Sequence, residues 1–415
     1  MFYYLGFIRR TATCILAGVE KEEIFGGTGL GALTKKAAIV GVAESDLGYT
    51  PDKTFLQLIA QATKRALDDA GMTIYDIDGF FSAGWTTMES MMVAEYLGIR
   101  PSYSDNTMPG GAAFEFHVQH AAAAISAGLC DTALICYAET RLSDRKKGIA
   151  MNFTAGSPQE PEEQFDVPYG LWVPIPVYAL SAQRHMYQYG TTSEQLAEIA
   201  VAARKWASLN PVATMRDALS IDDVLASPMM STPLRLRDCC LVSDGGGAVI
   251  ITAAERAKDL RKRPVWVLGC GESHTHRSIA AMPDLTVTPA RYSGERAFRM
   301  AGLGPSDIDL LELYDSFTIT VLLQLEDLGF CPKGEGGRFV EGQRLAPNGT
   351  CPVNTSGGGL SYIHTGMFGI FLLIEAARQL RGECAGRQVR GAKTALCNGI
   401  GGNLASSGTV ILGVD

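Results

Sequence analysis

The sequence lacks the features that would mark a membrane protein or a nucleic-acid-binding protein. It has no uninterrupted apolar run approaching the roughly 18–20 residues of a membrane-spanning helix. It also has no long run of basic residues that would neutralise phosphates, and its formal net charge is −8. We therefore expect no membrane span and no nucleic-acid partner.

Cysteine patterns and nucleotide-binding turns are missing as well. The ten cysteines include no CxxC pair and no regular spacing, so neither a zinc site nor a disulfide framework is indicated. Free thiols within apolar runs are typical of a reducing compartment, which predicts a cytoplasmic protein. No P-loop occurs, and the glycines at 26, 27 and 29 stand before the first strand rather than after it. No metal and no permanently bound cofactor are expected.

The first 34 residues show little of the periodicity that marks helices or strands. They contain two glycine-rich clusters, and aromatic residues precede the first arginines, which is the reverse of a secretory signal. We interpret residues 1–34 as a peripheral N-terminal extension, or as residues upstream of the natural start.

What the sequence does contain is an internal repeat. An apolar strand, a helix end with Ala-Gly followed by Asp-Ile-Asp, and a further apolar strand recur in the same order. The matching pairs are 35–45 with 264–273, 66–82 with 297–317, and 130–139 with 392–402. Self-similarity of this kind indicates an internal duplication. The predicted halves are residues 35–255 and 256–415.

The order of the elements predicts an α/β fold. Strands rich in Ile and Val alternate with helices, which favours mainly parallel sheets covered by helices. Two helical segments, beginning near 111 and 356, are apolar nearly all round and are expected to be buried between the two sheets. Polar stretches interrupt the first half at 141–235, which we interpret as an inserted loop domain.

Residues 107–128, TMPGGAAFEFHVQHAAAAISAG, contain a sharp turn that leads into a helix. A strand-to-helix turn of this kind is where many enzymes carry a nucleophile, because the helix N-terminus offers free N–H groups and positive dipole character. The turn itself contains neither Cys nor Ser, only Gly110, Gly111 and alanines. We call this turn the elbow.

These features together resemble the thiolase superfamily, and within it the lipid-transfer-protein-like thiolases, over residues 35–415. The resemblance rests on the duplication, on LVSDGGGAVI (241–250), and on the segments CPVNTSGGGLSYIHTGMFG (351–369) and GAKTALCNGIGG (391–402). It implies a thiolase-like five-layered αβαβα fold with duplicated halves and an inserted loop domain. It also implies a homodimer.

In that family four loops converge on the reacting carbon atoms. The first normally bears the nucleophilic cysteine, and the resemblance puts that position at or beside Gly111, so the ordinary acyl-enzyme is not expected. Backbone groups of Gly110, Gly111, Gly399 and Gly401 are the expected pocket donors. The other three loops are Tyr314–Phe317, Tyr362–Gly366 and Cys397–Gly402.

The resemblance assigns catalytic roles to four side chains. His364 is expected to hydrogen-bond the thioester oxygen and so stabilise an enolate. Tyr314, Tyr362 and Cys397 are candidates for proton transfer, and the glycine N–H groups after Cys397 could depress its thiol pKa. The alternatives are core-packing tyrosines and an inert buried thiol. Asp315 is expected to be a structural hydrogen-bonding residue.

The remaining histidines and basic residues carry weaker signals. His117 and His120 lie three residues apart on one predicted helix and are interpreted as core or interface residues, because no partner completes a metal site. His185 falls in the loop region, and His274 and His276 stay unassigned. The basic residues at 145–147 and 204–205 either meet the phosphates of coenzyme A or form a solvated surface.

Three functions remain open from the sequence. The favoured one is retro-aldol cleavage of a 3-hydroxyacyl-CoA, which needs a base and an enolate pocket but no nucleophile. The first alternative is an acyltransferase or 3-ketoacyl-CoA thiolase that uses Cys397 or a partner subunit. The second is a non-catalytic acyl-CoA or lipid-binding subunit. Coenzyme A would enter as part of the substrate, and the resemblance suggests a small OB-fold, zinc-ribbon partner protein.

Overall fold

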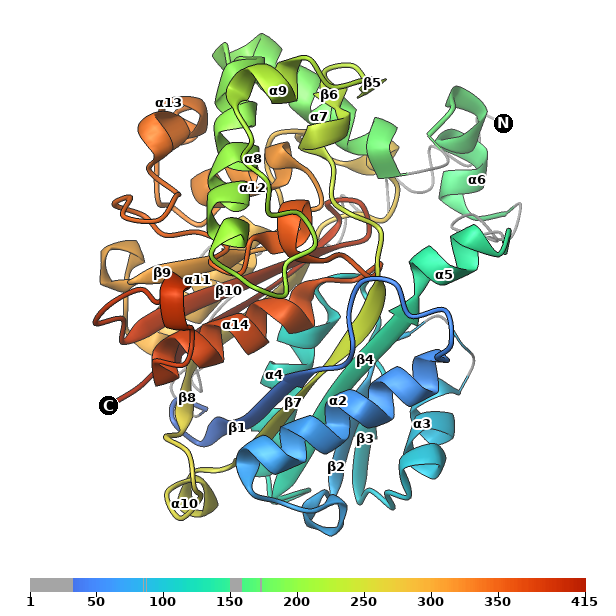
Figure 1. Ribbon diagram of the computed structural model, residues 1–415, viewed down its shortest axis with the longest axis vertical. Coiled ribbons are helices and arrows are strands. Elements are labelled where there is room, and N and C mark those ends of the chain that lie inside the picture. Colours follow the sequence, from blue (N-terminus) through green and yellow to red (C-terminus); the bar gives the residue numbers. More distant parts are fainter. Residues whose placement is uncertain (1–32, 85, 87, 150–158, 172–173) are drawn as a thin grey trace, which may run out of the picture. The chain divides into compact units, whose positions relative to one another are not determined.

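Nine strands of the described chain form one mixed β-sheet (Figure 1). The computed structural model describes residues 33–84, 86, 88–149, 159–171 and 174–415, so most of the predicted extension 1–34 lies outside these ranges. In spatial order the strands are β3 (Tyr103–Asp105), β2 (Gly79–Ser82), β4 (Thr132–Thr140), β7 (Asp244–Ala253), β1 (Ala37–Glu44), β8 (Val265–His274), β11 (Ser406–Gly413), β10 (Thr394–Gly401) and β9 (Leu310–Leu313).

Most neighbouring strands of this sheet run antiparallel, so the expectation of mainly parallel sheets was wrong. Strand β2 pairs in parallel with β3 and β4, and β9 pairs in parallel with β10. The other neighbours are antiparallel. The reason is visible at β10 and β11, which are joined by a short turn, because a short connection can join only antiparallel neighbours.

The strand order repeats within the sheet. The order β2-β4-β7-β1 in the first half corresponds to β9-β10-β11-β8 in the second. A short 3₁₀ turn precedes β2 at Ile74–Asp76, and another precedes β9 at Pro305–Asp307. The halves join where Ala38 and Ile39 of β1 pair with β8. The internal repeat of the sequence is therefore a repeat of topology.

The helices complete five layers. One outer helix, α2 (Phe55–Ala70), packs on β1, β7 and β4, and the other, α11 (Ala290–Ala301), packs on β8 and β11. Between them, α4 (Ala113–Ser126) and α14 (Gly369–Arg381) contact strands of both halves and each other. Figure 1 shows α14 lying between β10 and β1. The predicted αβαβα arrangement is confirmed.

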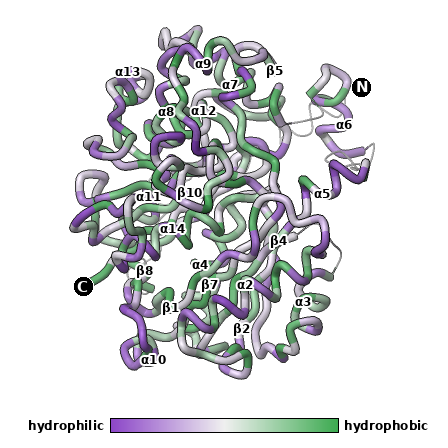
Figure 2. The backbone as a smooth tube through the Cα atoms, in the orientation of Figure 1, coloured by the Kyte–Doolittle hydropathy of each residue, from purple (hydrophilic) through white to green (hydrophobic). Residues whose placement is uncertain are grey.

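Local sequence explains why the outer and middle helices differ. Thr54 and Gln57 form a capping box at the start of α2, and Gly71 ends it in a left-handed conformation. Only one face of α2 is buried, whereas all but two residues of α14 are buried. The middle helices therefore need apolar residues nearly all round. Figure 2 shows hydrophobic residues along β4 and a mainly hydrophilic α5.

The region predicted as a loop domain is largely helical where it is described. Its helices α7 (Pro174–Tyr189) and α8 (Ser193–Ser208) pack against α12 (Thr318–Asp327), and α8 also contacts α13 (Gly336–Val340). None of the helices in the described ranges is long and apolar enough to cross a membrane. The remaining elements are α3 (Glu89–Leu97), α5 (Arg141–Lys146), α6 (Pro161–Phe165), α9 (Ile221–Leu225), α10 (Ala254–Ala257), β5 (Met229–Ser231) and β6 (Leu234–Arg235).

Candidate functional site

The elbow before α4 packs against the end of β10. Gly110 has a left-handed backbone (φ +87°), and a Cβ at this position would lie 2.9 Å from the amide nitrogen of Gly402. On the other side of the contact, a Cβ on Gly401 would overlap the carbonyl oxygen of Pro109. Glycine is required at both positions because the two backbones approach too closely for a side chain.

The space beside Gly111 is filled by the ring of Tyr314. A Cβ on Gly111 would lie 2.5 Å from the Cζ atom of that ring and 2.5 Å from the carbonyl oxygen of Ile400. Tyr314 follows β9, and its amide donates to the carbonyl oxygen of Asn398 across 2.9 Å. At the elbow, which the sequence analysis found to lack a nucleophilic side chain, the phenol ring of Tyr314 from the second half of the chain packs against the backbone.

The hydroxyl oxygen of Tyr314 lies 3.1 Å from Nε2 of His364, and the two rings meet edge to face with centroids 5.7 Å apart. The amide of Gly366 donates to Nδ1 of the same imidazole across 3.4 Å. A neutral ring therefore carries its hydrogen on Nε2 and donates it to the phenol oxygen. The backbone N–H of Phe368 also bonds to that oxygen. Two N–H donors converge on the oxygen of Tyr314.

Both members of this pair are uncharged near neutral pH. Burial, followed by the positive charge of Arg141, lowers the pKa of His364 to about 4. Burial is also the main reason that the pKa of Tyr314 is raised well above its ordinary value. A neutral pair avoids the cost of removing charge from water. Ionisation of either group must therefore be coupled to substrate binding or to proton transfer.

The loop that carries His364 is fixed by Tyr137 of β4. The Tyr137 hydroxyl donates to the carbonyl oxygen of Thr365 across 3.1 Å and accepts from the amide of Met367 across 3.0 Å. The amide of Ser243 donates to the carbonyl oxygen of His364 across 2.9 Å. These bonds come from the first half of the chain, so the imidazole is positioned by the packing of one half on the other.

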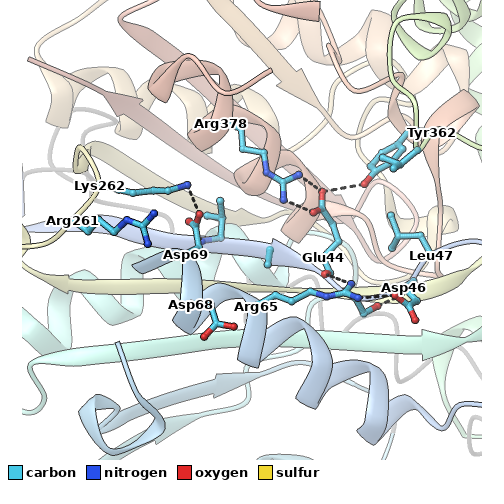
Figure 3. A pocket seen from close by; sticks show the side chains of 14 residues that line it. Glu44, Asp46, Leu47, Arg65, Asp68, Asp69, Arg261, Lys262, Tyr362 and Arg378 are labelled. Atoms are coloured by element: carbon cyan, nitrogen blue, oxygen red, sulfur yellow. Dashed lines mark hydrogen bonds and ion pairs between the residues drawn. The ribbon is translucent and has the colours of Figure 1, made fainter. Parts of the chain in front are cut away.

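Tyr362 is not brought together with Tyr314 and His364. Its hydroxyl donates to Oε1 of Glu44 across 3.0 Å, and Arg378 holds both oxygens of that carboxylate, with Nη1–Oε1 2.6 Å and Nη2–Oε2 2.5 Å. Figure 3 shows these three side chains lining a cavity of about 930 Å³ among other charged residues. The cause is local: a π-helical turn ends at Tyr362 and the chain is extended at Ile363, which turns the next side chain away.

Cys397 does not have the reactive environment that was expected of it. Its side chain is fully buried in β10, and its thiol points to the carbonyl oxygen of Leu372 across 3.6 Å. Burial, and then the nearby carboxyls of Glu312 and Glu115, raises the thiol pKa well above its ordinary value. The expected depression of this pKa by glycine N–H groups is not found, because burial is the largest effect on the thiol. This thiol is a poor nucleophile.

Two further residues complete the surroundings of Tyr314. Asp315 accepts from the amides of Gly359 across 2.6 Å and Leu360 across 3.2 Å, as expected of a structural hydrogen-bonding residue, and burial raises its pKa to about 7. Tyr178 of α7 was missed by the sequence analysis. Its ring centroid lies 4.5 Å from that of Phe317. No sequence motif surrounds Tyr178, so its place near Tyr314 could be identified only from the packing of the inserted region.

The other histidines have structural partners. His117 is buried with Nε2 2.9 Å from the carbonyl oxygen of Thr107. His185 is buried between Thr191 and Glu326, at 2.8 and 3.1 Å. These contacts agree with the interpretation of His117 as a core residue. The ring of His274 lies 5.2 Å from that of Phe116, and Nδ1 of His276 lies 2.9 Å from the hydroxyl of Thr275.

One of the two proposed phosphate-binding clusters is partly buried. Nε of Arg204 donates to the hydroxyl of Ser361 across 2.9 Å, and the arginine is only 6% exposed, so it has little surface to offer a ligand. Residues 145–147 are exposed at the end of α5. Within the described ranges, no group of three or more His, Cys, Asp or Glu side chains is arranged to hold a metal ion.

His120 bridges the two halves of the fold and gives stability that depends on pH. Nδ1 lies 2.6 Å from Asp105 and Nε2 lies 3.0 Å from Glu272 of β8, and these hydrogen bonds raise the pKa of His120 to about 9. A histidine whose folded pKa is raised stabilises the protein fully below its unfolded pKa of about 6.5. That contribution, on the order of 3 kcal/mol, is lost as the pH rises through about 9.

Thermal unfolding of the wild type and of His120→Gln between about pH 7 and pH 10 measures this contribution. We expect the midpoint of the wild type to fall toward that of the variant as the pH rises. A difference between the two midpoints that stays constant over this range would contradict the assignment of the charge to His120.

Comparison with known proteins agrees with the architecture. Residues 271–414 match the thiolase C-terminal domain-like family. The chain is 36% identical over 384 residues to acetyl-CoA acetyltransferase of Methanothermobacter thermautotrophicus, covering 89% of this chain and 97% of that protein. It is also 36% identical over 361 residues to 17-hydroxy-3-oxo-4-pregnene-20-carboxyl-CoA lyase of Mycobacterium tuberculosis, covering 84% and 92% of the two chains.

A solved structure of an Ltp2-ChsH2(DUF35) aldolase matches with a TM-score of 0.84 and 30% sequence identity, covering 92% of this chain and 99% of that one. The similarity extends over both halves of the repeat, beyond the C-terminal segment that the family match covers. On the strength of the five layers, the repeated strand order and these relatives, the chain belongs to the thiolase superfamily.

Proposed function

We propose that this protein breaks, and in reverse forms, the Cα–Cβ bond of a 3-hydroxyacyl-CoA thioester by retro-aldol chemistry. The observation that carries the proposal is the phenol of Tyr314, which occupies the space beside Gly111 while two N–H donors converge on its oxygen. The similarity to a lyase of a carboxyl-CoA compound and to an aldolase supports the same reaction class.

The reaction needs one proton acceptor and one place for negative charge. The β-hydroxyl loses its proton, its C–O bond becomes a carbonyl, and the electrons of the Cα–Cβ bond pass to the thioester, which becomes an enolate. The enolate then takes up a proton at Cα. The products are an aldehyde or ketone and a shortened acyl-CoA, and no covalent enzyme intermediate is formed.

Tyr314 is the acid–base group in this proposal. In cleavage the phenol oxygen accepts the β-hydroxyl proton while the phenol's own proton passes to Cα of the departing enolate, so the neutral phenol is regenerated. The N–H groups of His364 and Phe368 stabilise the negative charge that develops on the phenol oxygen during this transfer. In bond formation the neutral phenol returns the proton to the alkoxide. His364 thus acts through Tyr314 as well as through the pocket. Gly110 and Gly111 remain the proposed backbone contacts for the thioester, at the N-terminus of α4.

Acyl transfer is the second candidate, because one relative is an acetyl-CoA acetyltransferase. Thiolysis requires a thiolate that attacks the ketone of a 3-ketoacyl-CoA. The sequence has no cysteine in the elbow, and the thiol of Cys397 is buried with a raised pKa. These observations favour the aldolase. A non-catalytic acyl-CoA or lipid-binding subunit is the third candidate.

The proposed assembly is a cytoplasmic homodimer that works with a small OB-fold, zinc-ribbon partner protein. The similarity to the Ltp2-ChsH2(DUF35) aldolase supports a partner protein. Light scattering of the purified chain tests the dimer. Co-expression with a candidate partner, followed by measurement of the same cleavage reaction, tests the requirement for a second subunit.

Product analysis by liquid chromatography and mass spectrometry tests the function. The purified chain receives matched 3-hydroxyacyl-CoA and 3-ketoacyl-CoA panels, the latter with free CoA. We expect release of an aldehyde or ketone and a shortened acyl-CoA from the hydroxy substrates alone. Cys397→Ala is expected to change that rate by no more than about threefold, since the thiol is buried. CoA-dependent cleavage of only the keto substrates, abolished in Cys397→Ala, would establish the thiolase instead.

A further inference from the structure

Glu115 of α4 is a buried carboxyl group without a hydrogen-bond partner. The residue is 1% exposed, and neither of its side-chain oxygens has a partner among the described residues. An ionised carboxylate that is buried and unpaired costs several kcal/mol, and such a group takes up a proton instead. A group of this kind in the middle layer of the fold calls for a functional explanation.

The chain makes room for this carboxyl by omitting three side chains. A Cβ on Gly369 of α14 would lie 2.5 Å from Oε2 of Glu115, and a Cβ on Gly399 of β10 would overlap the same oxygen. A Cβ on Gly408 of β11 would lie 2.7 Å from the Cβ of Glu115. Gly399 and Gly408 face each other in register across the two strands. Glycines from three elements thus form a cell around one side chain.

Two walls of this cell, those of α14 and β10, and the segment before α4 also contact Tyr314. The α14 wall begins after Phe368, whose N–H bonds the phenol oxygen. The β10 wall follows Asn398, whose carbonyl oxygen accepts from the Tyr314 amide across 2.9 Å. Gly111 lies just before α4, four residues ahead of Glu115, and the Tyr314 ring fills the space beside it. The carboxyl therefore lies where the three supports of the phenol meet.

We propose that Glu115 is a neutral, proton-bearing carboxyl group that positions Tyr314 by tying together the three backbone segments that hold it. The carbonyl oxygen of Gly111 lies against the same glycine wall, because a Cβ on Gly369 would meet both that oxygen and Oε2 of Glu115. A neutral Glu115 also keeps negative charge away from the place where the enolate forms. This proposal rests on the proposed function in assigning the reaction to Tyr314.

Titratable groups on the neighbouring strands favour the neutral form. Cys397 of β10 and Glu312 of β9 are fully buried on this side of the sheet, and neither offers a positive charge. On α14 and β11 the facing residues are Gly369 and Gly408. Burial raises the pKa of Glu115 well above its ordinary value. The protonated form is thus the expected one at neutral pH.

Infrared difference spectroscopy tests the protonation state without using activity. Spectra of the wild type and of Glu115→Gln are recorded at about pH 8, where exposed carboxyls with a pKa of about 4 are ionised. The difference is expected to show loss of the C=O stretch of a protonated carboxylic acid. The bands of other buried carboxylic acids cancel in the difference spectrum, because these groups are present in both proteins. Loss of a carboxylate band instead would overturn the proposal.

Kinetics test whether Glu115 acts through Tyr314. Glu115→Gln, which keeps the shape and a hydrogen-bond donor, is expected to lose no more than about threefold in kcat. Glu115→Ala is expected to lose about 10- to 100-fold in kcat with little change in KM, because a small displacement of a reacting group has effects of this size. In a Tyr314→Phe background the same alanine substitution is expected to lower kcat no further.

Equal losses from Glu115→Ala in the presence and absence of the Tyr314 hydroxyl would overturn positioning as the role of this carboxyl. An equal loss in Glu115→Gln and Glu115→Ala would also overturn it. If Tyr314→Phe itself retained the full rate, the proposed role of Tyr314 would fail, and the infrared spectrum would still decide whether Glu115 is neutral. If the wild type cleaved none of the 3-hydroxyacyl-CoA panel, the proposed function would fail. Failure of one proposal is therefore distinguishable from failure of the other.

Discussion

Tyr314→Phe is expected to lower kcat for cleavage of a 3-hydroxyacyl-CoA by about 10²- to 10⁴-fold, the usual range for loss of an acid–base group. Binding of the acyl-CoA is expected to remain. The phenylalanine ring still fills the space beside Gly111, so only the oxygen is removed. That oxygen is the atom on which the N–H donors of His364 and Phe368 converge. Steady-state kinetics with product analysis, and calorimetric titration with a CoA thioester, measure the two quantities.

Tyr362→Phe is the matched control for this prediction. It removes the same atom from a buried tyrosine of the same segment, but its hydroxyl bonds Glu44 rather than the His364 imidazole. We expect the kcat of the control to change by no more than about threefold, with some loss of stability from the broken hydrogen bond. Cleavage by Tyr314→Phe at the wild-type rate would contradict the assignment of Tyr314 as the acid–base group. So would equal losses in the two variants.

Gly111→Cys is expected to abolish cleavage without creating a thiolase. The new side chain restores a thiol to the elbow, yet its Cβ would collide with the Tyr314 ring and with the carbonyl oxygen of Ile400. Overpacking of a filled site costs about 1–3 kcal/mol and displaces its neighbours. The phenol would be the group that moves, because the carbonyl belongs to a strand. Thermal unfolding and product analysis on both substrate panels give the result.

Two companion variants separate steric effects from chemistry. Gly111→Ala adds the colliding Cβ without a thiol and is expected to lose stability and cleavage to a similar extent. Gly386→Ala is the neutral control, because no atom lies within 4 Å of a Cβ at that position. A stable Gly111→Cys protein that cleaves 3-ketoacyl-CoA with free CoA would show that the elbow still accepts a nucleophile, and would overturn the proposed role of Tyr314 there.

The internal repeat and the order of the layers could be predicted because both depend on local sequence patterns. The helix α2 is marked by a capping residue at Thr54, a one-sided apolar face and Gly71 at its end. The apolar character of α4 and α14 predicted burial between two sheets. Both helices are buried in the middle layer, although the strands on either side of them belong to the two halves of one continuous sheet. Strand direction was not predictable in the same way, because the β10–β11 pairing depends on how tightly the chain turns between the strands.

The sequence by itself determined the duplicated layers, the elbow without a nucleophile at Gly111, and the loops that bring Tyr314 and His364 to one place. Only the tertiary structure decided that Tyr362 points to the carboxylate of Glu44 rather than to His364, and that Cys397 faces the buried middle layer. The physical reason is that side-chain direction changes with one residue of backbone conformation, and a pKa depends on burial by segments far away in the chain. Neither quantity can be deduced from a motif alone.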